Sequence, residues 1–449
     1  RLGLIFVGCV CKAQGTIWSQ SWQARVELAF RSRVPRVAAR VAGFVLPCFP
    51  IFAYTICMGM RLFFSAGDPS GDLHASNLIR CLKGVAPHCE VRGFGGPRML
   101  EAGLDQDFDL TLLAVMGITE VLPKLRDFFR LADQAEECFK RGEVDAVVLV
   151  DFPGFNWHIA KRAKAKGIPV YYYLPPQLWA WGGWRIGKMR RTVDCVLASL
   201  PMEVDYYRKA GMPVISVGHP FFDHVAQQTL DQQWMVDHRP VDRVHIALLP
   251  GSRSHEVRHN WPWQLAVLRR LSQTTKTPLH FSVAALKENH ARWCQDQCLD
   301  LDRSVSISFS VGKTSEILAM ADCALSKSGS VSLELMARGV PTAIIYRVSA
   351  PTYLIGRTLS PLRSMTLPNL IAGEILMPEF LSVRLGETQI RQVSDAMTPW
   401  IEDPHVRAQQ RTRLLDLTGR IGAPGASLRA ARALKALLQA TNSTSQRVA

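Results

Sequence analysis

The sequence predicts an α/β protein made of two Rossmann-like domains, each a doubly wound parallel sheet, that face one another across a cleft. Two observations support this fold class. From Met60 onward, short apolar runs rich in β-branched residues alternate with helical patterns, as they do in parallel sheets whose strands are connected by helices. The chain also has 449 residues, more than one hydrophobic core usually serves, so two domains of about 150 to 200 residues are expected.

The predicted strands form two series that are separated by a polar stretch over residues 227–242. The strands of the first series are expected over residues 62–66, 146–150, 170–174, 193–198 and 214–217. Those of the second series are expected over residues 245–249, 279–283, 305–309, 322–325 and 342–345. We therefore expect an atypical extension over 1–59, a first domain over 60–225, a second domain over 226–405, and a helical segment with a frayed tail over 406–449.

The extension over residues 1–59 differs in composition from the rest of the chain. It holds seven Lys or Arg residues against a single Glu, and the chain begins with Arg1, whereas Met60 would place the first predicted strand at a chain terminus. It shows neither helical nor strand periodicity, so we expect an over-extended gene start or a disordered segment. The alternative is a targeting or membrane segment, because residues 42–57 are almost wholly apolar. Pro47 and Pro50 interrupt that stretch, which is also short for a spanning helix.

Charge and cysteine content limit the partners that are expected. The formal net charge of +15 favours anionic partners such as phosphates, nucleotides or acidic lipid headgroups. No recognition helix, zinc finger or RNP motif accompanies this charge, so no nucleic-acid partner is expected. The eleven cysteines show neither a CxxC pair nor zinc spacing, which favours free thiols in a reducing cytoplasm.

A series of motifs follows the predicted strands at their carboxyl ends, where open α/β sheets bind ligands. The motifs are Gly67-Asp68-Pro69-Ser70-Gly71-Asp72, Asp151-Phe152-Pro153-Gly154-Phe155-Asn156, Pro176-Gln177-Leu178-Trp179, Leu249-Pro250-Gly251-Ser252-Arg253 and Ser328-Gly329-Ser330. In this order, over roughly residues 60–440, they resemble the lipid-A-disaccharide synthases of glycosyltransferase family 19, which have the two-domain GT-B fold. The stretches that add to the resemblance are 93–99, 114–122, 217–220 and 367–370.

The resemblance implies an inverting glycosyltransferase of lipid A biosynthesis. It implies that UDP-2,3-diacylglucosamine and 2,3-diacylglucosamine 1-phosphate (lipid X) are joined into the β(1→6)-linked lipid A disaccharide 1-phosphate, with release of UDP. The first domain would bind the acylated acceptor and face the membrane, and the second would bind the UDP-sugar. The resemblance also implies an enzyme without a cofactor, a peripheral position on the cytoplasmic face of the inner membrane, and a homodimer.

Asp151 is the expected catalytic base. It directly follows the apolar run 146–150, and a carboxylate at a strand end can accept a proton from an attacking sugar hydroxyl. The resemblance implies the same role for this position, and a helix cap or loop carboxylate is the alternative. Because the family often carries a second acid where this chain has Gly154, a paired-carboxylate mechanism is not expected.

The loop that contains Asp68, Ser70, Gly71 and Asp72 is expected to bind the acceptor. Its glycines allow close approach of the backbone, and the N-terminus of the following helix offers free N–H groups to a phosphate or sugar. The family usually has Glu in place of Asp68. The carboxylate of Asp68 therefore keeps the charge but reaches less far than that of the family's Glu. An ordinary structural turn is the alternative.

Ser252 and Arg253 are expected to bind the donor. An arginine after a buried strand can grip a diphosphate with two hydrogen bonds and neutralise the charge that develops on departing UDP. A surface arginine in a turn is the alternative. Ser328, Gly329 and Ser330 precede a predicted helix and offer hydroxyl and N–H groups to a phosphate.

Three further residues are candidates. By resemblance, Glu334 would hold the ribose hydroxyls and Asn369 would lie near the donor cleft. A solvated Glu behind an ordinary helix cap is the alternative for Glu334. His219 could contact the hinge or a phosphate, although a lone histidine is more often structural.

Gln177 and Trp179 are expected to bind substrate because their motif belongs to the same series. Around Trp179 lies a mixture of indoles and cations that suits lipid headgroups and, equally, the lining of a core or cleft. This mixture comprises Trp179, Trp181, Trp184, Arg185, Lys188, Arg190 and Arg191.

One apparent metal motif is present. His255-Glu256-Val257-Arg258-His259 fits the pattern H-E-x-x-H, but no third ligand is evident. We therefore expect a metal-independent transferase in which arginine and helix dipoles replace a cation.

Two other functions stay open. One is a UDP-N-acetylglucosamine transferase or epimerase of the same architecture that acts on another acceptor. The second is a non-catalytic protein that binds membrane surfaces through its basic and aromatic residues. UDP release without the acylated acceptor would favour the first, and liposome binding without turnover would favour the second.

Overall fold

The structure is a computed structural model that describes residues 59–113, 125–180, 182–347, 364–383 and 386–448. The predicted extension, up to residue 58, and the whole of the stretch 114–122 lie outside these residues. Everything below concerns the described part of the chain.

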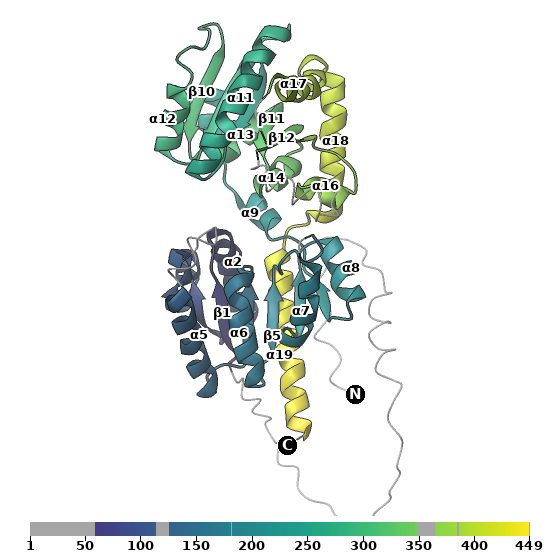
Figure 1. Ribbon diagram of the computed structural model, residues 1–449. Helices are drawn as coiled ribbons and strands as arrows, with labels where there is room; N and C mark the ends of the chain where they lie inside the picture. The colour runs from purple at the N-terminus through teal and green to yellow at the C-terminus, as the bar shows by residue number, and fades with distance from the viewer. Residues whose placement is uncertain (1–58, 114–124, 181, 348–363, 384–385, 449) are drawn as a thin grey trace, which may run out of the picture. The chain divides into compact units, whose positions relative to one another are not determined.

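The first half of the described chain forms a parallel sheet of seven strands (Figure 1). These are β1 (Arg61–Ala66), β2 (Glu90–Gly95), β3 (Asp105–Asp109), β4 (Ala146–Val150), β5 (Val170–Tyr173), β6 (Cys195–Ala198) and β7 (Val214–Ser216). Their order across the sheet is β3-β2-β1-β4-β5-β6-β7. The chain runs outward from β1 and returns on its other side at β4, so the carboxyl ends of β1 and β4 form a switch point of the kind where ligands bind.

The second half repeats this topology with six strands among the described residues. These are β8 (Val244–Leu249), β9 (Leu279–Ala285), β10 (Ser306–Val311), β11 (Cys323–Lys327), β12 (Thr342–Arg347) and β13 (Glu379–Ser382). The order is β10-β9-β8-β11-β12-β13, which puts the second switch point between β8 and β11.

Helices connect the strands of both sheets. In the first half they are α2 (Pro69–Val85), α3 (Pro97–Glu101), α5 (Leu125–Lys140), α6 (Pro153–Ala165), α7 (Ile186–Thr192), α8 (Pro201–Lys209) and α9 (Phe221–Gln227). The helices that follow are α10 (Gln232–His238), α11 (Ser254–Thr274), α12 (Glu288–Asp296), α13 (Thr314–Met320), α14 (Val331–Ala337), α16 (Leu367–Ala372), α17 (Glu387–Glu402), α18 (Pro404–Ile421) and α19 (Ala426–Val448). Among the described residues, no helix combines the length and the apolar character needed to cross a membrane.

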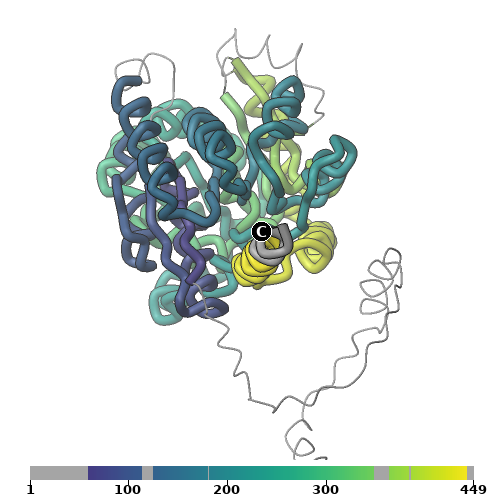
Figure 2. Tube along the Cα trace, turned by 90° about the horizontal axis from the view of Figure 1, so that it is seen from below, coloured from purple at the N-terminus to yellow at the C-terminus, as the bar shows by residue number. Residues whose placement is uncertain are grey.

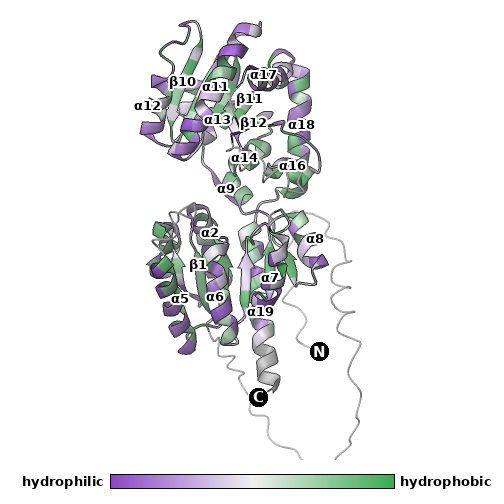
Figure 3. Ribbon diagram, in the orientation of Figure 1, coloured by the Kyte–Doolittle hydropathy of each residue, from purple (hydrophilic) through white to green (hydrophobic). Residues whose placement is uncertain are grey.

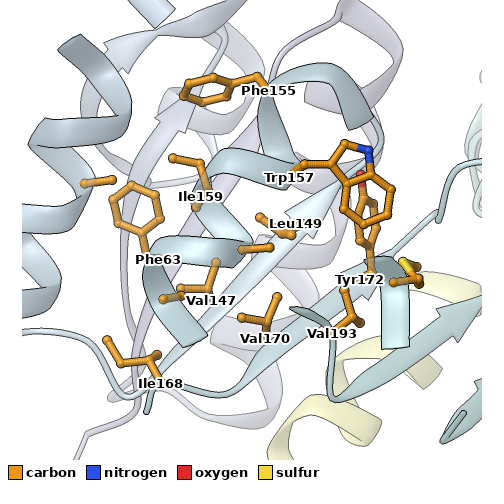
Figure 4. Close-up of a cluster of buried hydrophobic side chains, with 14 of the residues drawn as sticks. Phe63, Val147, Leu149, Phe155, Trp157, Ile159, Ile168, Val170, Tyr172 and Val193 are labelled. Atoms are coloured by element: carbon orange, nitrogen blue, oxygen red, sulfur yellow. The ribbon is translucent and has the colours of Figure 1, made fainter. Parts of the chain in front are cut away.

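Both faces of the first sheet are buried. Phe63, Val147 and Trp157 belong to the cluster on the face covered by α5 and α6 (Figure 4). Leu62 and Phe64 pack on the opposite face with α2, because successive side chains of a strand point to opposite sides. Figure 3 shows the same division, with hydrophobic strands and hydrophilic outer surfaces on α5, α12 and α18. Burial on two faces explains why the parallel strands have continuous apolar sequences.

All ten predicted strands are confirmed, with ends that differ by up to two residues. Sequence analysis missed β2, β3 and β13. Strand β2 contains Gly93 and Gly95, and β3 is an edge strand that carries three aspartates, so neither has an apolar run. Their strand conformation comes from pairing with β1 and β2, which a local pattern does not show.

The C-terminal helix α19 packs on the first sheet. Ala430, Leu434 and Leu438 belong to the same cluster as Leu78 of α2. Figures 1 and 2 both show α19, in yellow, beside segments of the first half. Asp223 caps this helix, since its carboxylate accepts hydrogen bonds from three backbone N–H groups at 2.5 to 2.9 Å, those of Gly425, Ala426 and Ser427.

Candidate active site

A cavity of about 440 Å³ lies at the carboxyl ends of strands from both sheets. Of the residues predicted from the sequence, Ser70, Asp151 and Gln177 line it from the first half, and the 328–330 loop lines it from the second. Residues that are far apart in the sequence therefore meet at one space, which we call the Asp151 cavity.

The Asp151 backbone is held in an unusual conformation. Asp151 and Phe152 both have φ of 46°, in the left-handed region that non-glycine residues rarely adopt. The carbonyl oxygen of Asp151 accepts hydrogen bonds from Asn156 Nδ2 at 2.7 Å and from the Tyr172 hydroxyl at 2.8 Å. Asn156 is itself buried and accepts a hydrogen bond from the Ser65 hydroxyl at 2.6 Å. These bonds offset the strain and fix the direction in which the Asp151 side chain leaves β4.

Asp68 supplies a second carboxyl group beside Asp151. Burial, followed by the interaction with Asp68, raises the pKa of Asp151 to about 7. A neighbouring carboxylate makes ionisation of a carboxyl group less favourable, because two like charges would then lie close together. This neighbour was not anticipated from the sequence, where only the position of Gly154 was considered. It comes from the end of β1, which pairs with β4 in the sheet.

The loop after β8 presents Arg253 to solvent. The Arg253 side chain is 52% exposed, and its Nη1 lies 3.5 Å from Oε1 of Glu256. The other Glu256 oxygen accepts hydrogen bonds from Ser252 N at 3.0 Å, Ser252 Oγ at 3.3 Å and Arg253 N at 3.3 Å. Glu256 therefore shapes the loop and leaves most of the Arg253 guanidinium available for an anion.

The H-E-x-x-H sequence follows this loop and lies within the first turns of α11. Its glutamate is the loop-shaping Glu256, and Nδ1 of His259 is 2.6 Å from the carbonyl oxygen of His255. Within the described ranges, no group of three His, Cys, Asp or Glu side chains is arranged to hold a metal ion.

Comparison with known proteins identifies the family. A family model described as lipid-A-disaccharide synthetase matches residues 62–420. The chain belongs to the lipid-A-disaccharide synthase family. A lipid-A-disaccharide synthase from Syntrophus aciditrophicus is 34% identical over 367 residues, which are 82% of this chain and 94% of the relative. The predicted activity, synthesis of the lipid A disaccharide by glycosyl transfer, is thereby confirmed.

Solved structures confirm the predicted GT-B fold class of this lipid-A-disaccharide synthase family member. A UDP-GlcNAc 2-epimerase from Neisseria meningitidis bound to UDP-GlcNAc has a TM-score of 0.55 and 13% identity, covering 85% of this chain and 99% of its own. The glycosyltransferase of kitacinnamycin has a TM-score of 0.53 and 15% identity, covering 84% and 98%. At these identities the likeness concerns the fold alone.

Glu203 is an ionisable residue of the Asp151 cavity that sequence analysis missed. It is only 2% exposed, and its Oε2 accepts hydrogen bonds from Ser199 N, Ser199 Oγ and Leu200 N at 3.0 to 3.1 Å. Burial raises the pKa of Glu203 to about 7 in spite of these donors. A glutamate at the third position of a helix could have been identified as a capping residue. Its burial in the cavity depends on tertiary packing.

Two histidines also line the Asp151 cavity. The rings of His74 and His219 are 6.0 Å apart, and Nδ1 of buried His74 has no hydrogen-bond partner among the described residues. Burial lowers the pKa of His74 to about 3 and that of His219 to about 4, so both are neutral at pH 7. His219 was expected at a hinge or phosphate, or as a structural residue. Its Nδ1 accepts a hydrogen bond from Phe221 N at 3.2 Å.

In the loop that contains Asp68, the backbone N–H groups have other partners than expected. The N–H groups of Ser70 and Gly71, expected to face a ligand, both donate to Asp68 Oδ1, at 2.9 and 2.8 Å. The N-terminus of α2 is thus capped from within the chain. Ser70 still lines the cavity, whereas Gly71 is buried beside the cap.

Asp72 was predicted to contact the substrate, but the structure places it elsewhere. Its buried carboxylate accepts hydrogen bonds from Gly96 N, Arg98 N and Met99 N at 2.9 to 3.1 Å. A buried carboxylate needs such donors, and here they are the first N–H groups of α3. Asp72 therefore holds α3 in place and does not line the Asp151 cavity.

Asn369 was also predicted to contact the substrate, and the structure again shows other partners. Its amide donates to Met377 O and Glu379 Oε1, and its Oδ1 accepts from Leu376 N and Met377 N, all at 2.7 to 2.8 Å. With both ends of the amide occupied and the residue buried, no group is left for a substrate. Asn369 instead fixes the 376–379 segment.

Glu334 and Trp179 do not line the Asp151 cavity. Glu334 is buried, and its Oε1 pairs with the Arg338 guanidinium at 2.9 Å. Arg338 in turn donates to Gln228 at 2.8 Å. Trp179 is partly buried, and its Nε1 has no hydrogen-bond partner among the described residues.

Proposed function

We propose that this protein transfers the glucosamine unit of UDP-2,3-diacylglucosamine to the 6-hydroxyl of 2,3-diacylglucosamine 1-phosphate, with inversion and release of UDP. The observation that supports this most is the Asp151 cavity itself, because a carboxyl group suited to proton transfer and the 328–330 loop line the same space. Family membership supplies the substrates of the proposal.

In the proposed mechanism, ionised Asp151 accepts the proton of the acceptor hydroxyl as its oxygen attacks C1 of the donor sugar. The bond between C1 and the diphosphate oxygen breaks, and its electron pair stays on UDP. Arg253 and the hydroxyl groups of Ser328 and Ser330 would stabilise that charge. A pKa near 7 suits a base at neutral pH, since it combines a large ionised fraction with affinity for the proton.

An acylated substrate is supported by a second, apolar cavity next to Asp151. It measures about 270 Å³ and is lined mainly by hydrophobic side chains. Those of Leu125, Phe128, Phe129 and Phe152 are among them. We propose that acyl chains lie here while the sugar occupies the Asp151 cavity.

We further propose that the protein acts peripherally on the cytoplasmic face of the inner membrane. Trp184 is 81% exposed, with the Arg185 guanidinium 5.5 Å from the centre of its ring. Such a pair suits a headgroup layer. Flotation with anionic vesicles tests this proposal, with Trp184→Ser expected to reduce binding. The homodimer stays a prediction that light scattering in solution tests.

The decisive experiment measures UDP release from UDP-2,3-diacylglucosamine with and without the acylated acceptor, and identifies the product by mass spectrometry. Acceptor-dependent UDP and a disaccharide 1-phosphate are expected. UDP release without acceptor would instead indicate an epimerase-like reaction. Vesicle binding without turnover would indicate the non-catalytic alternative.

A further inference from the structure

An ion pair joins the two donor-side motifs of the second sheet. Lys327, the last residue of β11, donates from Nζ to Glu256 Oε1 at 3.0 Å. Sequence analysis considered Glu256 only as part of an apparent metal motif and did not consider Lys327.

The glycines of both motifs leave room for this pair. Gly251 has φ of +141°, and a Cβ on it would lie 2.6 Å from Cβ of Glu256. A Cβ on Gly329 would lie 3.1 Å from Nζ of Lys327. The lysine therefore lies across the backbone of the 328–330 loop, and the shape of both loops depends on where Glu256 and Lys327 are placed.

Arg253, Lys327 and Glu256 together carry a net positive charge. Arg253 and Lys327 both approach Oε1 of Glu256, while Oε2 is taken by the N–H groups of Ser252 and Arg253. Burial opposes ionisation of Glu256, but Lys327 and these donors keep its pKa below the usual value. Two cations thus share one carboxylate, and the surplus positive charge can be neutralised by an anionic ligand.

Lys327 faces the space where such a ligand would bind. Its side chain is 22% exposed, against 13% for Glu256, and it lines two cavities of about 450 and 170 Å³. In the smaller cavity, Lys327 is the one charged side chain among the described lining residues, and three residues with hydroxyl groups line the same cavity. These hydroxyls belong to Ser252, Thr314 and Ser330. A cation among hydroxyls and exposed backbone is a suitable site for a phosphate.

We propose that Lys327 contacts the diphosphate of the sugar nucleotide and stabilises UDP as it departs, and that Glu256 is a positioning residue that holds Lys327 and the Arg253 loop in place. This inference rests on the proposed function, because it takes the donor to be a uridine diphosphate sugar. During the transfer, Lys327 pairs with the oxygen that receives the electron pair of the broken bond.

The test measures the affinities of UDP, UMP and uridine for the full chain by calorimetry, without acceptor or turnover. Lys327→Met is expected to weaken UDP binding roughly 10- to 100-fold, as for loss of one charge-assisted hydrogen bond, and to change uridine binding less than about twofold. Lys327→Arg should restore most of the loss. Lys276→Met, which removes an exposed lysine at the amino end of β9, is the matched control and should bind UDP like the wild type.

Glu256 is tested with a double-mutant cycle. Glu256→Gln is expected to weaken UDP binding in the wild-type background and to have a smaller effect when Lys327 is already Met, because its action passes partly through Lys327. Melting temperatures establish that each variant is folded. The proposal is overturned if Lys327→Met leaves UDP affinity unchanged, or lowers UDP and uridine affinity alike as a purely structural ion pair would. It is also overturned if the wild-type protein does not bind UDP.

The experiments distinguish a failure of this inference from a failure of the proposed function. A wild-type protein that makes the disaccharide, with a Lys327→Met variant of unchanged UDP affinity, would contradict the inference alone. A protein that binds UDP through Lys327 but forms no disaccharide would contradict the proposed function alone.

Discussion

The carboxyl group of Asp68 lies beside that of Asp151 at the carboxyl ends of the neighbouring strands β1 and β4, and it raises the pKa of the buried Asp151. Burial, and then the neighbouring Asp68, make Asp151 harder to ionise than an isolated aspartate. The proposed base is therefore half ionised near neutral pH, and its protonation should be visible in the pH dependence of the reaction.

The acidic limb of the pH profile should report this pair. We expect kcat/KM to rise with pH with a midpoint near 7, the pKa of Asp151. Asp68→Asn removes the neighbouring charge while keeping a hydrogen-bonding side chain, so the midpoint should move to lower pH. The measurement is kcat/KM from pH 5 to 9 for both proteins. A midpoint that stays in place or moves upward would show that Asp68 does not raise the pKa of Asp151.

Removing the base should abolish most of the activity. Asp151→Asn is expected to lower kcat by about 10²- to 10⁴-fold, the usual contribution of general base catalysis, with little change in melting temperature. Asp205→Asn, at an exposed position on α8, is the control and should retain full activity. If the Asp151→Asn enzyme were active, another group would have to be the base, and Glu203 would be the first candidate.

The Tyr172 hydroxyl should contribute to both stability and turnover. Tyr172→Phe removes one of the two hydrogen bonds to the Asp151 carbonyl oxygen, at a cost of about 0.5 to 1.5 kcal/mol in the free energy of unfolding. Because the left-handed turn is then held less firmly, kcat should fall more than KM rises. Urea denaturation and steady-state kinetics test this, with Tyr206→Phe as the control. Equal kcat for the two variants would mean that Asn156 alone holds the turn.

At acidic pH, the free energy of unfolding should depend on the protonation of His245. Burial lowers the pKa of His245 to about 4, below the value of about 6.5 in an unfolded chain. The unfolded state therefore binds the extra proton first, so stability from the neutral imidazole is complete above about pH 6.5 and is lost as pH falls toward 4.

This effect is best seen by comparison with a variant. The raised pKa values of Asp151 and Glu203 act in the opposite sense, since they favour the folded state at lower pH. His245→Gln keeps a side chain that can reach Ser282, the 2.8 Å partner of Nε2, but it does not titrate. Between pH 6 and 5, its free energy of unfolding should fall less steeply than that of the wild type, by up to about 1.4 kcal/mol per pH unit. Parallel slopes in urea denaturation would contradict the prediction.

The sequence predicted the fold class and several of the residues that line the Asp151 cavity. Parallel strands buried on two faces must be continuously apolar, so strands such as β4 and β8 were evident from composition alone. Ligand loops follow the carboxyl ends of such strands, which is why Ser70, Asp151 and the 328–330 loop were identified and do line one cavity. Strand β3, at the sheet edge and rich in aspartate, lacked that signal.

Only the tertiary structure decided which polar groups face the cavity and which are occupied inside the protein. Asp72 and Asn369 lie in motifs as suggestive as that of Asp151, but their hydrogen-bonding groups are taken up by the backbone of α3 and of the 376–379 segment. The pairing of Asp68 with Asp151 and of Lys327 with Glu256 depends on which strands and loops are neighbours. Residue type and strand position are local properties that a sequence carries, whereas a carboxylate's partners, and hence its charge and its role, are set by contacts between segments far apart in the chain.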